Sequence, residues 1–143
     1  MEKLNCKGLY HINEKGIIAP YEVGNENTII CGIPGAYTHD CTNNHLPGFV
    51  ANLDKLKQHT ITKVVFIGVN DSFVMKAWND QYGHPDIDSV SDPLATFAKY
   101  LKKDVDWGES FGVRSHRYAF LIQNGNITHE FKIPFIEGVL QEL

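Results

Sequence analysis

Two short apolar runs constrain the fold of this chain more than any other feature of its sequence. They cover residues 28–33 and 63–69, and neither alternates between apolar and polar side chains. Unbroken runs of this length are typical of central strands that are buried on both faces, as in parallel sheets covered by helices. We therefore expect a central sheet with helices packed on both of its faces.

The segments around these runs predict the other elements. Apolar residues at spacings of three and four predict a helix over residues 39–58, which Pro47 should kink or interrupt because proline lacks a backbone donor. Phe73, Val74, Ala77 and Trp78 should form the inner face of a second helix, over residues 72–81. Further helices are expected over residues 93–102 and 133–143, strands over 7–12, 16–23, 87–90, 118–123 and 126–132, and a polar loop over 104–114.

Two local signals refine this order. Pro20 indicates an edge position for the strand that contains it, and Asn124-Gly125 predicts a hairpin between the last two strands. Alternating strands and helices followed by a hairpin predict a mixed α/β sheet of about five to seven strands on a thioredoxin-like plan. Residues 1–143 are enough for a single domain with one core.

Composition excludes several classes of function. The net charge is −4 and there is no basic run, which argues against a nucleic-acid partner. No apolar stretch approaches the ~20 residues of a membrane span, and the first residues lack the apolar core of a secretion signal. Three cysteines, an odd and small number, fit a reducing cytoplasm better than a disulfide-bonded exterior.

The most informative motif follows the first apolar run. Pro34-Gly35 ends the strand, Thr38 is a good N-cap for the helix, and Cys41 falls in the first turn of that helix. Unpaired N–H groups and the helix dipole favour a thiolate at such a position. Position alone favours a reactive Cys41 but leaves an inert, buried thiol open. Thr38 either donates to a substrate or only caps the helix, and Pro34 either shields the thiol or only ends the strand.

Arg117 is the second candidate for the site. It stands at the start of the late apolar strand, where an arginine needs a partner or a functional reason. Its permanent charge would hold a nearby thiolate, and a surface salt bridge is the alternative. Arg114 is interpreted as a loop arginine.

The remaining chemistry-bearing residues give weaker signals. Cys31 lies in an apolar strand and reads as an inert core residue, while Cys6 lies near a terminus that we expect to be mobile. His39 and His45 lie in or near the cysteine helix, with no role assigned from the sequence. Neither a Cys-x-x-Cys pair nor a His-x-x-x-His pair is present, so we expect no metal, and no glycine-rich motif indicates a nucleotide or another cofactor.

The segment Pro34-Gly35-Ala36-Tyr37-Thr38-His39-Asp40-Cys41 resembles the Pro-x-x-x-Thr/Ser-x-x-Cys motif of the peroxiredoxins. His45-Leu46-Pro47-Gly48-Phe49, the segment from Val69 to Met75, and Arg114-Ser115-His116-Arg117-Tyr118-Ala119 resemble the type-5 subfamily, which is also called atypical or plant type II. The resemblance covers roughly residues 28–131. It implies a thioredoxin-like fold and the thiol-dependent reduction of hydroperoxides.

The resemblance also implies roles for individual residues. Cys41 matches the peroxidatic cysteine, Thr38 the hydroxyl that orients the peroxide, Pro34 the shielding proline and Arg117 the arginine that stabilises the thiolate and the transition state. Attack of the thiolate on a peroxide oxygen would give a sulfenic acid on Cys41.

Two departures from the subfamily shape the expected cycle. No cysteine follows Cys41, and the segment 131–136 is shorter than usual. We therefore expect a one-cysteine cycle in which glutathione, a glutaredoxin or a thioredoxin reduces the sulfenic acid. The resemblance also suggests a homodimer, and Phe49, Phe73 and Trp78 are candidates for its contact.

Two other classes of function compete with a peroxidase. One is a non-catalytic redox sensor or partner-binding module, in which oxidation of Cys41 alters an interaction. The other is a disulfide reductase of thioredoxin type, which normally needs the Cys-x-x-Cys pair that this chain lacks.

Overall fold

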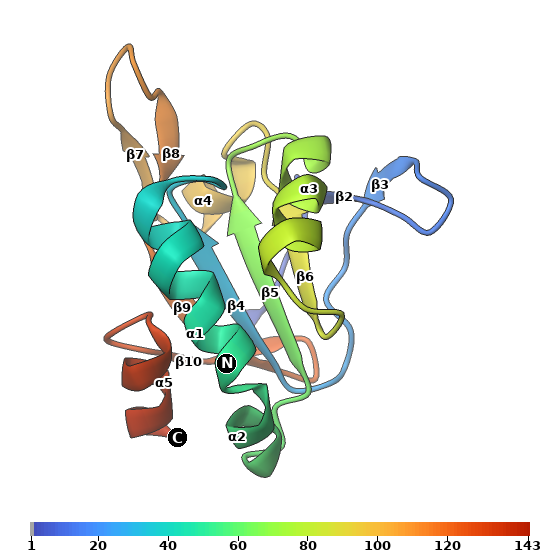
Figure 1. Cartoon of the computed structure of the whole chain (residues 1–143), viewed down its shortest axis with the longest axis vertical. Helices are drawn as coiled ribbons and strands as arrows, with labels where there is room; N and C mark the ends of the chain where they lie inside the picture. The colour runs from blue at the N-terminus through green and yellow to red at the C-terminus, as the bar shows by residue number, and fades with distance from the viewer. Residues whose placement is uncertain (1) are drawn as a thin grey trace.

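The structure, a computed structural model, describes residues 2–143. Within these residues one mixed sheet of eight strands forms the centre of the molecule, in the order β1-β10-β9-β4-β5-β6-β2-β3 (Figure 1). The strands are β1 (Glu2–Lys3), β2 (Tyr10–Ile12), β3 (Ile18–Pro20), β4 (Thr28–Ile33), β5 (Lys63–Gly68), β6 (Ile87–Ser91), β9 (Tyr118–Gln123) and β10 (Asn126–Glu130).

The two unbroken apolar runs form the middle of this sheet. β4 pairs in parallel with β5, and β5 pairs in parallel with β6. Every residue of β4 is buried, as expected of a strand covered on both faces. On its other side β4 pairs antiparallel with β9, which returns through Asn124-Gly125 into β10. The predicted mixed sheet and its late hairpin are confirmed.

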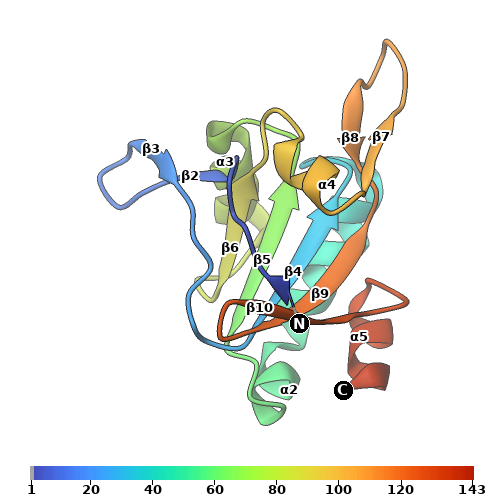
Figure 2. The same ribbon diagram turned by 180° about the vertical axis from the view of Figure 1, so that it is seen from behind.

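Helices cover both faces of the sheet (Figures 1 and 2). One face carries the π-helical turn η1 (Cys41–His45), α1 (Leu46–Ala51), α2 (Leu53–Gln58), α3 (Ser72–Tyr82) and α5 (Ile136–Glu142), and the other carries α4 (Thr96–Tyr100). A hydrophobic cluster lies on each face of the sheet, and alternate side chains of β4 pack into one or the other. Cys31 packs in the cluster that contains Cys41 and Trp78, whereas Ile30 packs in the cluster that contains Phe97.

The helix predicted over residues 39–58 is divided at a different place from the one expected. Pro47 lies in the first turn of α1, where a missing backbone donor costs little. The preceding turn is π-helical, because the N–H of Leu46 bonds to the carbonyl of Cys41. The break between α1 and α2 falls instead at Asn52, whose φ of −121° is not helical.

Three other segments differ from the sequence-based expectation. Residues 104–114 are not a plain loop, since β7 (Asp104–Asp106) and β8 (Val113–Ser115) form a separate hairpin. α4 begins at Thr96, later than predicted. The carboxylate of Asp92 accepts from the N–H groups of Phe97 and Ala98 in the first turn of α4 at 2.9 Å each. Of the predicted inner face of α3, Val74 and Trp78 do pack on the core, whereas Phe73 and Ala77 are exposed. Ser72 and Met75 are buried in their place.

The N-terminal hairpin is present but short. β2 and β3 pair antiparallel, and Pro20 lies on β3 at the edge of the sheet, where a missing N–H breaks no ladder. β1, which the sequence did not predict, adds the opposite edge by pairing with β10.

Candidate active site

The candidate site lies at the carboxyl end of β4, where two loops that follow parallel strands meet. The backbone N–H of Ala36 donates to Oδ1 of Asn70, which follows β5, at 2.9 Å. The carbonyl of Pro34 accepts from Nη1 of Arg114 at 3.3 Å. A side chain at Gly35 would place its Cβ 2.8 Å from the same nitrogen and would push the guanidinium aside. Arg114 is therefore a bracing residue of the Pro34 loop, and the loop interpretation missed its contact.

Thr38 uses its hydroxyl differently from the prediction. Oγ1 donates to the carbonyl of Gly35 at 2.7 Å, after a turn in which Tyr37 has a φ of +63°. Within residues 2–143 this hydroxyl accepts no bond from the helix, so the expected N-cap bond is wrong. Because its proton is committed to Gly35, the oxygen of Thr38 keeps its lone pairs for an acceptor role.

Cys41 is the first residue of η1 and is fully buried in the cluster between the sheet and the helices. The next residue fixes this turn against α3, since Oγ1 of Thr42 accepts from Nε1 of Trp78 at 3.0 Å. At the far end of the turn, His45 is also buried. The candidate nucleophile and a buried histidine are therefore the first and last residues of one helical turn.

Arg117 reaches this turn because β9 runs antiparallel to β4. The pairing of Gly32 with Tyr118 places Arg117 beside the carboxyl end of β4. Its Nη1 donates to Nδ1 of His45 at 2.8 Å. Within the described residues Arg117 forms no ion pair with a carboxylate, so the surface salt bridge is not its role.

The charge of Arg117 extends to the start of the cysteine helix. The pKa of the Asp40 carboxyl lies below its ordinary value, chiefly because of hydrogen bonds from His39 and Asn44, and Arg117 contributes to the same direction. Asp40 directly precedes Cys41, so the field of the guanidinium acts on the backbone that carries the thiol.

His45 is the residue that the sequence could not separate from His39. His39 is exposed, whereas His45 packs against the rings of Phe49, Phe66 and Phe135. Burial, with Arg117 second, lowers the pKa of His45 from 6.5 to about 3.

The two hydrogen bonds of His45 fix its tautomer. Nε2 lies 3.1 Å from the carbonyl of Pro134, which only accepts, and Nδ1 faces the guanidinium of Arg117, which only donates. His45 is therefore neutral with its proton on Nε2. A protonated His45 ring would direct the N–H at Nδ1 toward the Arg117 cation, and this repulsion contributes to the low pKa of His45.

The other two cysteines are not part of this turn. Cys31 is buried within β4, and burial raises the pKa of its thiol. Cys6 packs in the cluster on the opposite face of the sheet, and burial also raises its pKa. The expectation that Cys6 sits in a mobile terminus is wrong, because its side chain is buried against Tyr21 and its neighbours.

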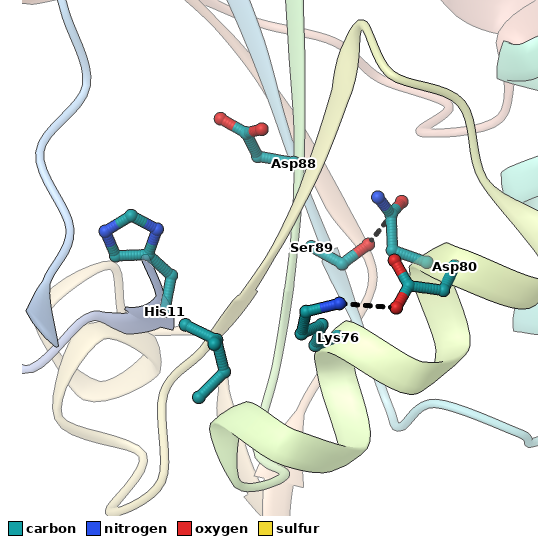
Figure 3. A pocket seen from close by; sticks show the side chains of 7 residues that line it. His11, Lys76, Asp80, Asp88 and Ser89 are labelled. Atoms are coloured by element: carbon teal, nitrogen blue, oxygen red, sulfur yellow. Dashed lines mark hydrogen bonds and ion pairs between the residues drawn. The ribbon is translucent and has the colours of Figure 1, made fainter. Parts of the chain in front are cut away.

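A polar hollow of about 180 Å³ lies between β2, α3 and β6, and no predicted site residue lines it (Figure 3). Four of its polar residues form two pairs: Lys76 with Asp80 at 2.6 Å, and Ser89 with Asn79 at 2.9 Å. In the part of the chain that the structure describes, no group of three or more His, Cys, Asp or Glu side chains is placed to hold a metal ion. Nor does any helix within residues 2–143 have the length and apolarity to cross a membrane.

Comparison with known proteins places the chain and its fold in one family. Residues 20–142 match the Redoxin family. Peroxiredoxin-2C of Oryza sativa subsp. japonica is 36% identical over 127 residues, which are 82% of this chain and 78% of that protein. Peroxiredoxin-2D of Arabidopsis thaliana is 32% identical with the same coverage. The structure of reduced Prx3 in complex with H2O2 from Vibrio vulnificus has a TM-score of 0.90 and 29% identity, covering 99% of this chain and 96% of its own.

These matches define a thioredoxin-like redoxin fold, which confirms the predicted plan. The chain belongs to the peroxiredoxins, in the plant type II and Prx5-like subfamily, and is a thiol-dependent peroxidase. It acts on a hydroperoxide through a peroxidatic cysteine and needs a thiol reductant. An enzymatic function thus takes precedence over the sensor and the disulfide reductase.

Proposed function

We propose that Cys41 is the peroxidatic cysteine, and that the enzyme reduces hydrogen peroxide and organic hydroperoxides in a one-cysteine cycle. One observation carries this proposal: Cys41 begins a helical turn whose last residue, His45, holds Arg117 at 2.8 Å. Neither Cys6 nor Cys31 has a cation bound to its own turn or strand in this way within the described residues.

In the proposed reaction the Cys41 thiolate attacks one peroxide oxygen and the O–O bond breaks. The sulfur gains that oxygen and becomes a sulfenic acid, while the other oxygen leaves and takes a proton to form water or an alcohol. Negative charge moves from sulfur to the leaving oxygen, so fixed donors around the two oxygens lower the barrier.

The surroundings of Cys41 support a division of labour. Arg117 has one nitrogen bonded to His45, which leaves its other N–H groups for the thiolate and the peroxide oxygens. The hydroxyl of Thr38 donates to Gly35 and so accepts from the O–H of the peroxide. Pro34, held through its carbonyl by Arg114, shields the thiolate from water.

A thiol from outside the chain completes the proposed cycle. It attacks the sulfur of the sulfenic acid, water leaves, and a second thiol breaks the resulting mixed disulfide. Glutathione, a glutaredoxin or a thioredoxin would supply these thiols. Support comes from the absence of any cysteine after Cys41 in this sequence, from the place of Cys6 on the opposite face of the sheet, and from the place of Cys31 within β4.

Assembly and location belong to the same proposal. Phe49 and Trp78 are fully buried, so the predicted dimer contact through them is wrong, whereas Phe73 is 61% exposed and remains a candidate contact for a homodimer. A cytoplasmic location is proposed from cysteine usage, although the names of related peroxiredoxins include chloroplastic and mitochondrial members.

The test is the single variant Cys41→Ser. The reduced variant should consume no hydrogen peroxide in the presence of glutathione and glutaredoxin, while its circular dichroism spectrum stays that of the wild type. Cys6→Ala is the matched control and should retain turnover. Mass spectrometry of the wild type after one equivalent of peroxide should place one added oxygen on Cys41. A disulfide from Cys41 to Cys6 or Cys31 would contradict the one-cysteine cycle.

A further inference from the structure

Phe135 connects the C-terminal segment to both members of the Arg117–His45 pair. The centre of its ring lies 4.7 Å from that of His45, with the two planes 40° apart. The guanidinium carbon of Arg117 lies 5.2 Å from the same ring centre, which is a cation–π distance. One half-buried aromatic ring thus contacts the candidate catalytic arginine and the histidine that holds it.

The position of Phe135 is set by the C-terminal segment itself. Phe135 directly precedes α5 in an extended conformation, and the carbonyl of the preceding Pro134 accepts from Nε2 of His45 at 3.1 Å. α5 packs Ile136 and Val139 into the same core cluster that contains Cys41. A hydrogen bond also joins the start of this segment to the end of α5, since the backbone N–H of Lys132 donates to the carboxylate of Glu142 at 2.8 Å.

A guanidinium on a long side chain needs more than one contact to stay in one place. The bond to His45 fixes one nitrogen of Arg117 but leaves rotation about the bonds of its side chain. A ring face beside the guanidinium removes that freedom and attracts the charge without using any N–H donor. The N–H groups that face the substrate therefore remain available.

We propose that Phe135 is a positioning residue for Arg117: its ring holds the guanidinium on one side while the adjacent Pro134 carbonyl orients the histidine that holds it on the other. The C-terminal segment thereby sets the geometry of the arginine that acts on the peroxide. This inference rests on the role proposed above for Arg117.

A leucine at position 135 separates this role from plain burial. Phe135→Leu keeps an apolar side chain over His45 but lacks the ring that attracts a cation, whereas Phe135→Tyr keeps the ring. We expect the single-turnover rate of Cys41 oxidation by hydrogen peroxide to fall about two- to fivefold in Phe135→Leu. The rate should stay within about twofold of the wild type in Phe135→Tyr.

A double-mutant cycle tests whether Phe135 acts through Arg117. In an Arg117→Gln background, which should itself be slow, adding Phe135→Leu should change the rate by less than about twofold. Ile133→Ala is the matched control, because Ile133 lies on the same segment and is exposed at 54%. It should keep the wild-type rate, and circular dichroism of each variant verifies that the fold persists.

The outcomes distinguish this inference from the proposed function. If Arg117→Gln is slow but Phe135→Leu reacts at the wild-type rate, Phe135 does not position the arginine and the role of Arg117 stands. A loss from Phe135→Leu that is equally large in both backgrounds would also overturn the inference, because it would mean a structural effect independent of the arginine. Wild-type reactivity of Arg117→Gln would refute the role of Arg117 and, with it, this inference.

Discussion

Nη1 of Arg117 donates to Nδ1 of His45 at 2.8 Å, and the two residues lie 72 positions apart in the chain. The bond ties the start of β9 to the turn that begins with Cys41. It also places a neutral histidine, rather than a carboxylate, against the guanidinium. A carboxylate would neutralise the arginine, whereas a neutral acceptor fixes its position and leaves its full charge for an anionic thiolate.

The burial of His45 predicts a loss of stability in acid. The pKa of His45 is 6.5 in the unfolded chain and about 3 in the fold, so below pH 6.5 the unfolded state binds a proton that the folded state refuses. The contribution of the neutral His45 ring to the stability of the fold is therefore complete above pH 6.5 and is lost as the pH falls toward 3. When the pH is lowered from 7 to 4.5, the free energy of unfolding measured in urea should fall by about 2–3 kcal/mol more in the wild type than in His45→Asn.

The control for this prediction is His39→Asn, which removes an exposed histidine from the adjacent turn. It should leave the pH dependence within a few tenths of a kcal/mol of the wild type. An NMR titration of the wild type gives a second measurement, in which the ring nitrogens of His45 should keep the neutral form with the proton on Nε2 down to about pH 4. An equal fall in the free energy of unfolding in acid for the wild type and His45→Asn would contradict the lowered pKa of His45.

Arg114 should matter for the shape of the Pro34 loop. Arg114→Ala removes the donor to the Pro34 carbonyl and leaves space beside Gly35, so the loop before Cys41 gains freedom. We expect the free energy of unfolding to fall by about 1–2 kcal/mol. The rate of Cys41 oxidation should fall about three- to tenfold in stopped-flow measurements, because a mispositioned site loses rate.

Lys55→Ala controls for the loss of a positive charge, since Lys55 is exposed on α2. It should change neither quantity. Arg114→Lys should rescue only part of the loss, because lysine cannot replace both the bond to Pro34 and the bond from Nε to the carbonyl of Phe111. An unchanged rate in Arg114→Ala would show that the loop keeps its shape without this brace.

Thr38 should act through its hydroxyl and not through its methyl group. Thr38→Val removes the oxygen that would accept from the peroxide, and the rate of Cys41 oxidation should fall about a hundredfold. Thr38→Ser keeps the bond to Gly35 and should stay within about threefold. Thr128→Val removes a hydroxyl that donates to the carbonyl of Leu121 on the neighbouring strand, and it should leave the rate unchanged. Equal rates for Thr38→Val and Thr38→Ser would contradict the role.

Local sequence determined most of the elements. The unbroken apolar runs became β4 and β5, Asn124-Gly125 became the turn between β9 and β10, and Asp71 caps α3 by accepting from the N–H of Val74 at 2.9 Å. Each of these depends on residues within a few positions of one another, so spacing and residue type were enough. The candidate set Pro34, Thr38 and Cys41 rests on local spacing in the same way.

Local patterns were misleading at three places. The hydroxyl of Thr38 suits an N-cap, but the positive φ of Tyr37 turns the chain so that the hydroxyl meets the Gly35 carbonyl instead. Phe73 has the spacing of an inner-face residue, but the orientation of α3 on the sheet exposes it. Residues 104–114 have few apolar side chains, yet their backbones pair as a hairpin.

The tertiary structure alone brought Arg117, His45 and Phe135 together. Arg117 meets His45 only because β9 pairs antiparallel with β4, and Phe135 joins them only because α5 packs on the same face as η1. Nothing in the spacing of residues 45, 117 and 135 indicates this contact, since it depends on sheet register and helix docking. The sequence by itself thus determined the thiol, its turn and the candidate cation Arg117, while the fold determined that His45 and Phe135 hold this cation, because geometry at a site depends on distances in space and not along the chain.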